Sequence, residues 1–129
     1  MNPNENVLPE EPITRFIMQK AYYRPSRNEV KYNAFMPNKN GETSVYRTIN
    51  LEENEIYDIG KQYVAKVVGK PLLGRAEIPA SMAIDFGLKI QPKTEPHPRH
   101  ANIIDYPDDD SEKKLIALQL AAEAKLYLI

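Results

Sequence analysis

The chain has 129 residues, 42% of them hydrophobic, which is enough for one modest core and too little for two. The formal net charge is −1, and charges of both signs are spread along the sequence, so no global field attracts DNA or an anionic membrane. The absence of cysteine excludes a disulfide framework, a thiolate zinc site and a cysteine nucleophile.

Residues 1–12 are polar and acidic, and they have neither the basic start nor the apolar run of a secretory signal. This segment predicts a disordered leader, and residues 13–129 then form a single domain. No run of about 18 consecutive apolar residues occurs, so no membrane partner is expected. Together with the lack of cysteine, these features predict an intracellular, cytoplasmic protein.

Three segments in the first half of the domain predict strands, over residues 14–20, 31–36 and 43–49. The second and third segments are separated by residues 37–41, where asparagine and glycine supply the backbone freedom of a tight turn, so a hairpin is expected. Side chains alternate along a strand, which places Arg47 on the same face as the apolar Val45 and Ile49.

A helix is predicted from about residue 51 to residue 68. Asn50 is a good helix cap, and Glu53 lies three residues later at the spacing of a capping box. Gly69 follows the last apolar residue at helical spacing, where a glycine ends many helices. Gly60 inside the helix costs about 1 kcal/mol relative to alanine, and a close packing contact is one reason for a glycine there.

The second half predicts shorter elements, which are a strand over residues 71–78, a helical turn over 79–86, a strand over 88–90 and a strand over 101–105. The last helix is the clearest, because Asp110 or Ser111 can cap it and apolar residues recur at helical spacing to about residue 127. Strands and helices are intermixed without a strict alternation. The predicted fold class is therefore α+β, with a small mixed or antiparallel sheet and two main helices, over about 51–68 and 111–127.

Both histidines lie in the stretch Pro96–Asn102, which is followed by Asp105 and Asp108–Asp110. Two prolines place the histidines in an extended loop where their imidazoles need not converge, so no metal site is expected, and no cofactor is implied. His100 is the candidate catalytic acid or base, because histidine titrates near neutral pH and the adjacent Arg99 would lower its pKa. The alternative is a hydrogen-bonded loop histidine.

Arg47 and Arg75 each lie on a predicted strand with apolar residues two positions away. A charge in such surroundings must be paired or functional. A guanidinium binds phosphate through its planar fork, so both are candidate ligand-binding residues, with Arg99 and Asn102 beside them. The alternative is that the two strand arginines pair with structural carboxylates such as Glu77 or Asp85, or lie on solvated strand faces.

Tyrosines and basic residues alternate in one further region, which comprises Tyr22, Tyr23, Tyr32 and Tyr46 with Arg15, Arg24, Arg27 and Lys31. This interleaving is typical of a surface that binds single-stranded nucleic acid, and half-buried packing of tyrosines in strands is the alternative. The sequence has no phosphate-cradling glycine loop, no dinucleotide fingerprint and no serine nucleophile elbow. A dehydrogenase, a P-loop NTPase and an ordinary hydrolase are therefore disfavoured.

Three strings, in order along the chain from about residue 15 to its end, are Ser44-Val45-Tyr46-Arg47, Gly74-Arg75-Ala76 and Arg99-His100-Ala101-Asn102-Ile103 with Tyr106-Pro107. They resemble strings in a set of small uncharacterised bacterial proteins, in which a tryptophan is expected where this chain has Tyr106. The resemblance brings no established activity. It implies that Arg47, Arg75, His100 and Asn102 belong to one constellation.

Two hypotheses of different classes follow. In the first, Arg47 and Arg75 face the loop of His100 and Asn102 and form a pocket for a phosphate-bearing ligand, either a nucleotide or RNA, and whether catalysis occurs stays open. In the second, the chain is a non-catalytic interaction protein whose last helix or strand edge docks on a larger protein partner or on a second copy. Carboxylates that enclose each arginine would count against the first hypothesis.

Overall fold

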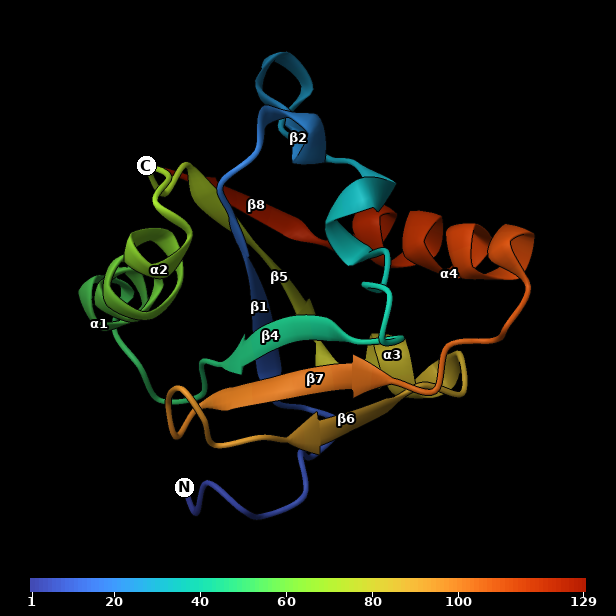
Figure 1. Ribbon diagram of the computed structural model, residues 1–129, viewed down its shortest axis with the longest axis horizontal. Helices are drawn as coiled ribbons and strands as arrows, with labels where there is room; N and C mark the ends of the chain where they lie inside the picture. The colour runs from blue at the N-terminus through green and yellow to red at the C-terminus, as the bar shows by residue number, and fades with distance from the viewer.

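A six-stranded antiparallel sheet forms the centre of the computed structural model, which describes residues 1–129 (Figure 1). The strand order is β6-β7-β4-β1-β5-β8. The strands are β1 (Pro12–Ile17), β4 (Thr43–Arg47), β5 (Gly74–Pro79), β6 (Lys89–Pro92), β7 (His100–Ile104) and β8 (Lys125–Leu128). A small second sheet pairs β2 (Tyr23–Arg24) with β3 (Glu29–Val30). The α+β class and the antiparallel sheet are confirmed.

The sheet is strongly twisted where β1 meets β4. Figure 1 shows β4, β7 and β6 running across the direction of β1 and β5. The ladder between β1 and β4 is short, with only the pairs Ile13–Arg47 and Thr14–Tyr46. Beyond these pairs the two strands diverge, and the gap is bridged by Arg15, whose Nη1 donates to the Ser44 carbonyl at 3.2 Å.

The first predicted helix is present as three consecutive helical stretches, α1 (Glu53–Ile59), the π-helical η4 (Gly60–Ala65) and α2 (Lys66–Val68). Its capping box joins Glu52 and Glu55, so the predicted cap at Asn50 is two residues too early. Gly69 ends the helix with a φ of 77°, a left-handed conformation that glycine adopts without strain, as predicted.

The second predicted helix, α4 (Asp110–Glu123), begins one residue earlier than predicted, and its cap is Asp109 instead of the expected Asp110 or Ser111, because the Asp109 side chain accepts a hydrogen bond from the Glu112 N–H. It ends earlier than predicted, since Lys125–Leu128 leave the helix and pair with β5 as strand β8. The predicted strand over residues 31–36 is also wrong, because most of it forms the 3-10 helix η3 (Tyr32–Phe35) packed on α4. The short helices α3 (Ala80–Asp85), η1 (Lys20–Tyr22) and η2 (Pro25–Arg27) complete the fold.

Helices cover both faces of the sheet, as Figure 1 shows with α4 on one side and α1 and α2 on the other. We call the face packed against α4 and η3 the α4 face; its buried side chains include Ile13, Val45, Ala76, Ile103 and Leu120 of the main core. The opposite face, which we call the α1 face, carries a smaller cluster formed by Phe16, Tyr46 and Ile56. At Gly60 an added Cβ would lie 2.7 Å from the Phe16 ring, which confirms the close packing contact expected there.

The N-terminal segment has no helix or strand before β1, yet it is held against the sheet. Backbone hydrogen bonds join the Ala80 N–H to the Glu11 carbonyl and the Ser81 N–H to the Pro9 carbonyl, each at 2.8 Å. Glu11 is only 3% exposed. The structure therefore differs from the predicted disordered leader over residues 1–12, because a buried arginine of β4 binds this segment. No helix has both the length and the apolar character needed to cross a membrane.

Candidate functional site

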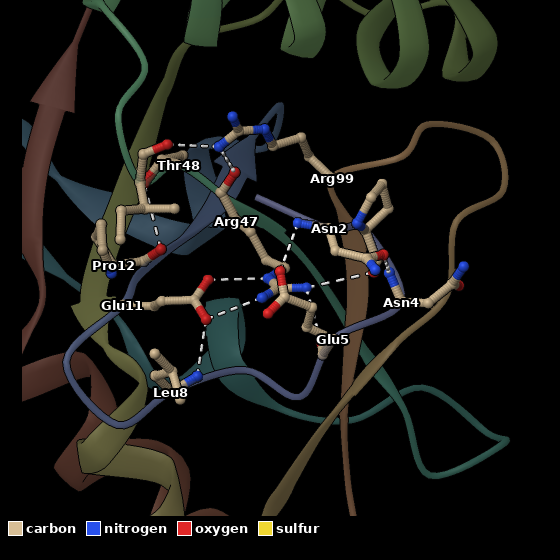
Figure 2. Close-up of polar contacts among 11 residues, drawn as sticks. Asn2, Asn4, Glu5, Leu8, Glu11, Pro12, Arg47, Thr48 and Arg99 are labelled. Atoms are coloured by element: carbon tan, nitrogen blue, oxygen red, sulfur yellow. Dashed lines mark hydrogen bonds and ion pairs between the residues drawn. The ribbon is translucent and has the colours of Figure 1, made fainter.

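Arg47 lies at the end of β4 on the α4 face and is 1% exposed. Its Nε and Nη2 each donate to the Glu11 carboxylate at 2.9 Å, and its Nη1 donates to the carbonyls of Pro3 at 3.3 Å and Glu5 at 3.0 Å (Figure 2). Four of the five guanidinium N–H groups therefore have protein partners. The arginine is enclosed by the N-terminal segment, which leaves no open fork for a phosphate.

The charge of Glu11 is maintained by this arrangement. Burial alone would raise the pKa of the Glu11 carboxyl, but the Arg47 guanidinium and the hydrogen bond from the Leu8 N–H outweigh it and hold that pKa below its ordinary value. Arg47 and Glu11 thus form a buried bidentate ion pair, whose geometry is among the stronger kinds of charge-assisted hydrogen bonding.

Arg75 lies on β5 and is enclosed by carboxylates in the same way, at 2% exposure. Its Nη1 donates to Glu77 at 2.7 Å and to the Thr14 hydroxyl at 2.9 Å, and its Nη2 donates to Glu53 at the start of α1. The ring of Tyr127 lies beneath the guanidinium, with 4.2 Å between Cζ and the ring centroid. The pairing with Glu77 is the structural alternative that the sequence left open.

The two arginines point to opposite faces of the sheet. Arg47 is the ladder partner of Ile13, and Arg75 is the ladder partner of Phe16. Ile13 and Phe16 are three residues apart on β1, so their side chains point in opposite directions. The predicted pocket with Arg47 and Arg75 side by side does not form. The sheet separates Arg47, on the α4 face, from Arg75, on the α1 face.

His100 and Asn102 lie together on the α1 face, where their ladder partners on β4 are Tyr46 and Ser44. The His100 Nδ1 lies 2.8 Å from the Lys93 carbonyl, which can only accept, so Nδ1 carries the proton. In the neutral ring Nε2 is then an acceptor, and the Ser44 hydroxyl donates to it at 2.8 Å. Burial lowers the pKa of the His100 imidazole, which favours this neutral form.

Arg99 and His97 occupy the loop before β7 and do not contact His100 through their side chains. The Arg99 Nη1 donates to the carbonyls of Arg47 at 3.3 Å and Ile49 at 2.5 Å, so this side chain closes the end of β4 (Figure 2). The His97 ring packs edge-on against Tyr63 at 4.7 Å. Burial lowers the pKa of His97 first and the Arg99 charge adds to it, so the expected influence of Arg99 acts on His97 and not on His100.

Of the tyrosines predicted to form a single-strand binding surface, Tyr22 and Tyr32 line two cavities, whereas Tyr46 is 3% exposed and belongs to the cluster on the α1 face. One cavity, of about 480 Å³, is lined by Arg15, Tyr22, Tyr32, Asn33, Met36, Pro37, Asn38, Glu42 and Ser44. The other, of about 460 Å³, is lined by Arg24, Glu29, Val30, Lys31, Tyr32, Lys114, Leu118, Ala121 and Ala122. We call them the Arg15 cavity and the Lys114 cavity. Four cations and two carboxylates line them together, although the whole chain is slightly acidic.

Cations and rings are in contact at both cavities. The Arg15 Cζ lies 5.7 Å from the Tyr22 ring centroid, and the Lys114 Nζ lies 4.8 Å from that of Tyr32. Neither cation has a carboxylate partner, and Lys31 has none either. Arg15 instead donates to the carbonyls of Ala34 and Ser44. Lys114 was not predicted as part of this region, because it lies on α4, far along the chain from the tyrosines.

No group of three or more histidine, aspartate or glutamate side chains is arranged to hold a metal ion. Comparison with protein families, with curated proteins and with solved structures finds no match to this chain.

Proposed function

We propose that the protein binds a phosphate-bearing ligand, a short single-stranded RNA, on the surface that joins the Arg15 cavity and the Lys114 cavity. The observation that carries this proposal is the set of cations without carboxylate partners, Arg15, Lys31 and Lys114, beside the rings of Tyr22 and Tyr32. Cations that neutralise phosphates, together with aromatic rings on which bases stack, are the two requirements for binding a single strand.

Electrostatics and size both support this assignment. A cation that is not neutralised by the protein remains available to a ligand phosphate, unlike Arg47 and Arg75, whose charges are neutralised inside the fold. Each cavity has a volume within the usual range for small-ligand sites, about 300–1,000 Å³. Tyr32 lines both cavities, so the two cavities share one aromatic ring.

Fluorescence anisotropy with a labelled oligouridine tests the proposal. Binding should weaken with salt, with a log–log slope of about −0.7 for each phosphate contact. Charge reversal of Lys31 and Lys114 to glutamate should abolish binding. The substitution Tyr32→Leu keeps an apolar side chain and removes the stacking ring, and it should weaken binding by about 1–3 kcal/mol per lost base.

A matched control reverses the same number of charges on the opposite side of the molecule, at the exposed Lys61 and Lys66 of the first helix. The control should leave the affinity unchanged. An equal loss in the control would show nonspecific attraction and would overturn the proposal. Binding of uridine monophosphate with the same affinity as the oligomer would restrict the site to a single nucleotide.

The non-catalytic interaction protein is the second candidate function, and exposed leucines on α4 favour it. Leu115 is 60% exposed and Leu118 is 45% exposed. Apolar side chains in contact with solvent are typical of surfaces that dock on a partner protein. Sedimentation analysis that gives a dimer in the wild type and a monomer in Leu115→Glu would support this function, whereas a wild-type monomer would count against self-association.

A further inference from the structure

We propose that Ser44 is a nucleophile activated by His100, and that this pair hydrolyses carboxylic esters with Asn102 as the donor to the developing oxyanion. The inference goes beyond RNA binding and does not depend on it. The sequence contains no nucleophile elbow, and the three residues instead come from the neighbouring antiparallel strands β4 and β7.

The first step in the argument is the direction of the hydrogen bonds. The Lys93 carbonyl fixes the proton on Nδ1 of His100, so the Nε2 lone pair points at the Ser44 hydroxyl, 2.8 Å away. A nucleophile bonded to a base, and a base oriented by a third group, is the arrangement that activates a serine. Here a backbone carbonyl takes the orienting position that a carboxylate often holds.

The second step is the position of Asn102. The Arg47 N–H donates to the Arg99 carbonyl at 2.8 Å, which makes that pair a hydrogen-bonded one. Hydrogen-bonded and non-hydrogen-bonded residue pairs alternate along an antiparallel ladder. Ser44 and Asn102 lie three pairs from Arg47 and Arg99, so they form a non-hydrogen-bonded pair, in which side chains approach most closely. Asn102 is 6% exposed, and its side-chain amide has no hydrogen-bond partner in the protein, although its polar atoms are not fully buried. An amide without a protein partner, opposite the nucleophile, is available to an oxyanion.

The third step is access and rigidity. Ser44 is half-buried and borders the Arg15 cavity, so it keeps contact with solvent while His100 is 7% exposed. Tyr46 packs against the imidazole with 5.2 Å between ring centroids, which restricts its rotation. All three proposed catalytic residues lie on strands, so their relative positions are held by the ladder.

The reaction balances with water as the only co-reactant. The Ser44 Oγ attacks the ester carbonyl carbon while its proton moves to His100 Nε2, and Asn102 donates to the oxyanion. The bond from the carbonyl carbon to the alcohol oxygen then breaks, and His100 returns the proton to the leaving alcohol. Water, deprotonated by His100, attacks the acyl-serine, releases the carboxylic acid and restores the hydroxyl.

Covalent labelling tests the nucleophile. A fluorophosphonate reacts with an activated serine by displacement of fluoride, and intact-mass measurement with peptide mapping locates the adduct. We expect one adduct on Ser44 in the wild type and none in Ser44→Ala. The variant Ser26→Ala changes an exposed serine away from the site, and it should label like the wild type. An unlabelled wild type, or an adduct on another residue, would overturn the proposal.

Turnover of p-nitrophenyl acetate tests the roles of the partners. Asn102→Ala should lower kcat by about 100-fold to 1,000-fold with KM little changed, as expected for loss of one oxyanion donor. His100→Gln should abolish both labelling and turnover, with thermal melts as the check on folding. If His100→Gln does not fold, Asn102→Ala decides, and an unchanged kcat there would refute the oxyanion role. Oligouridine binding should survive in Asn102→Ala, because Asn102 lines neither cavity, and this separates the proposal from the RNA site.

Discussion

Replacing Glu11 with glutamine removes the negative charge that faces the buried Arg47 guanidinium. Both side chains are almost fully buried, at 2% and 3% exposure, so water cannot replace the lost charge. Removal of one partner from a buried ion pair costs about 3–5 kcal/mol, because the other charge stays desolvated and unpaired. The glutamine oxygen can still accept one of the two hydrogen bonds, so we expect the lower half of that range.

This loss is large compared with the stability of the whole molecule. A chain of 129 residues at about 0.05–0.15 kcal/mol per residue has a free energy of unfolding of about 6–19 kcal/mol. In urea, an m-value of about 2 kcal/mol/M converts a loss of about 3–4 kcal/mol into a midpoint lower by about 1.5–2 M. Urea unfolding followed by circular dichroism measures this shift, and an unchanged m-value confirms that the loss is one of stability.

The exposed pair Arg24–Glu29 provides the matched control, since its side chains are 49% and 44% exposed at a distance of 3.0 Å. Glu29→Gln should cost less than about 1 kcal/mol, because water screens this pair. The double variant Glu11→Leu with Arg47→Met leaves no unpaired charge and should be more stable than Glu11→Gln alone. An equal and small loss in Glu11→Gln and Glu29→Gln would refute the reasoning, because it would show that Arg47 remains solvated.

Three further predictions concern local features. Gly60→Ala should destabilise the protein by about 1–3 kcal/mol, because the new methyl group meets the Phe16 ring; a gain of about 1 kcal/mol, as expected from helix propensity alone, would contradict this packing. Burial lowers the pKa of His97 and His100 from 6.5, so the unfolded chain binds more protons than the folded chain. Stability should be full above that pH and fall on acidification below it, and a free energy of unfolding in urea that does not change with pH would refute this prediction. Asp109→Ala removes the cap of α4 and should cost about 1 kcal/mol in thermal unfolding, whereas Asp109→Asn should retain most of the stability.

Local sequence signals predicted both main helices and placed their N-terminal ends to within one or two residues. The acidic run before Ser111 supplies the Asp109 cap of α4, and Gly69 ends the first helix in a left-handed conformation. The same local rules were wrong at the C-terminus, where Lys125–Leu128 can continue a helix but gain more by adding a strand to β5. They were wrong at Tyr32–Phe35 as well, because contact with α4 overrides the preference of these residues for a strand.

The candidate site shows a similar division. The apolar neighbours of Arg47 and Arg75 in the sequence predicted that each charge has a partner, and both arginines are paired. Glu77 was among the expected partners and pairs with Arg75. Glu11 could not be identified as the partner of the first, because it lies in a polar segment that by composition predicts disorder. Likewise, nothing local links Ser44 to His100, which is 56 residues away.

The sequence by itself determined that this chain forms an α+β domain with two main helices, that it has no cysteine chemistry, and that two strand arginines need partners. Only the tertiary structure decided which side chains meet. Strand register is set by pairing between distant segments, and a shift of one residue moves a side chain to the other face of the sheet. That register separates Arg47 from Arg75 and brings Ser44, His100 and Asn102 together.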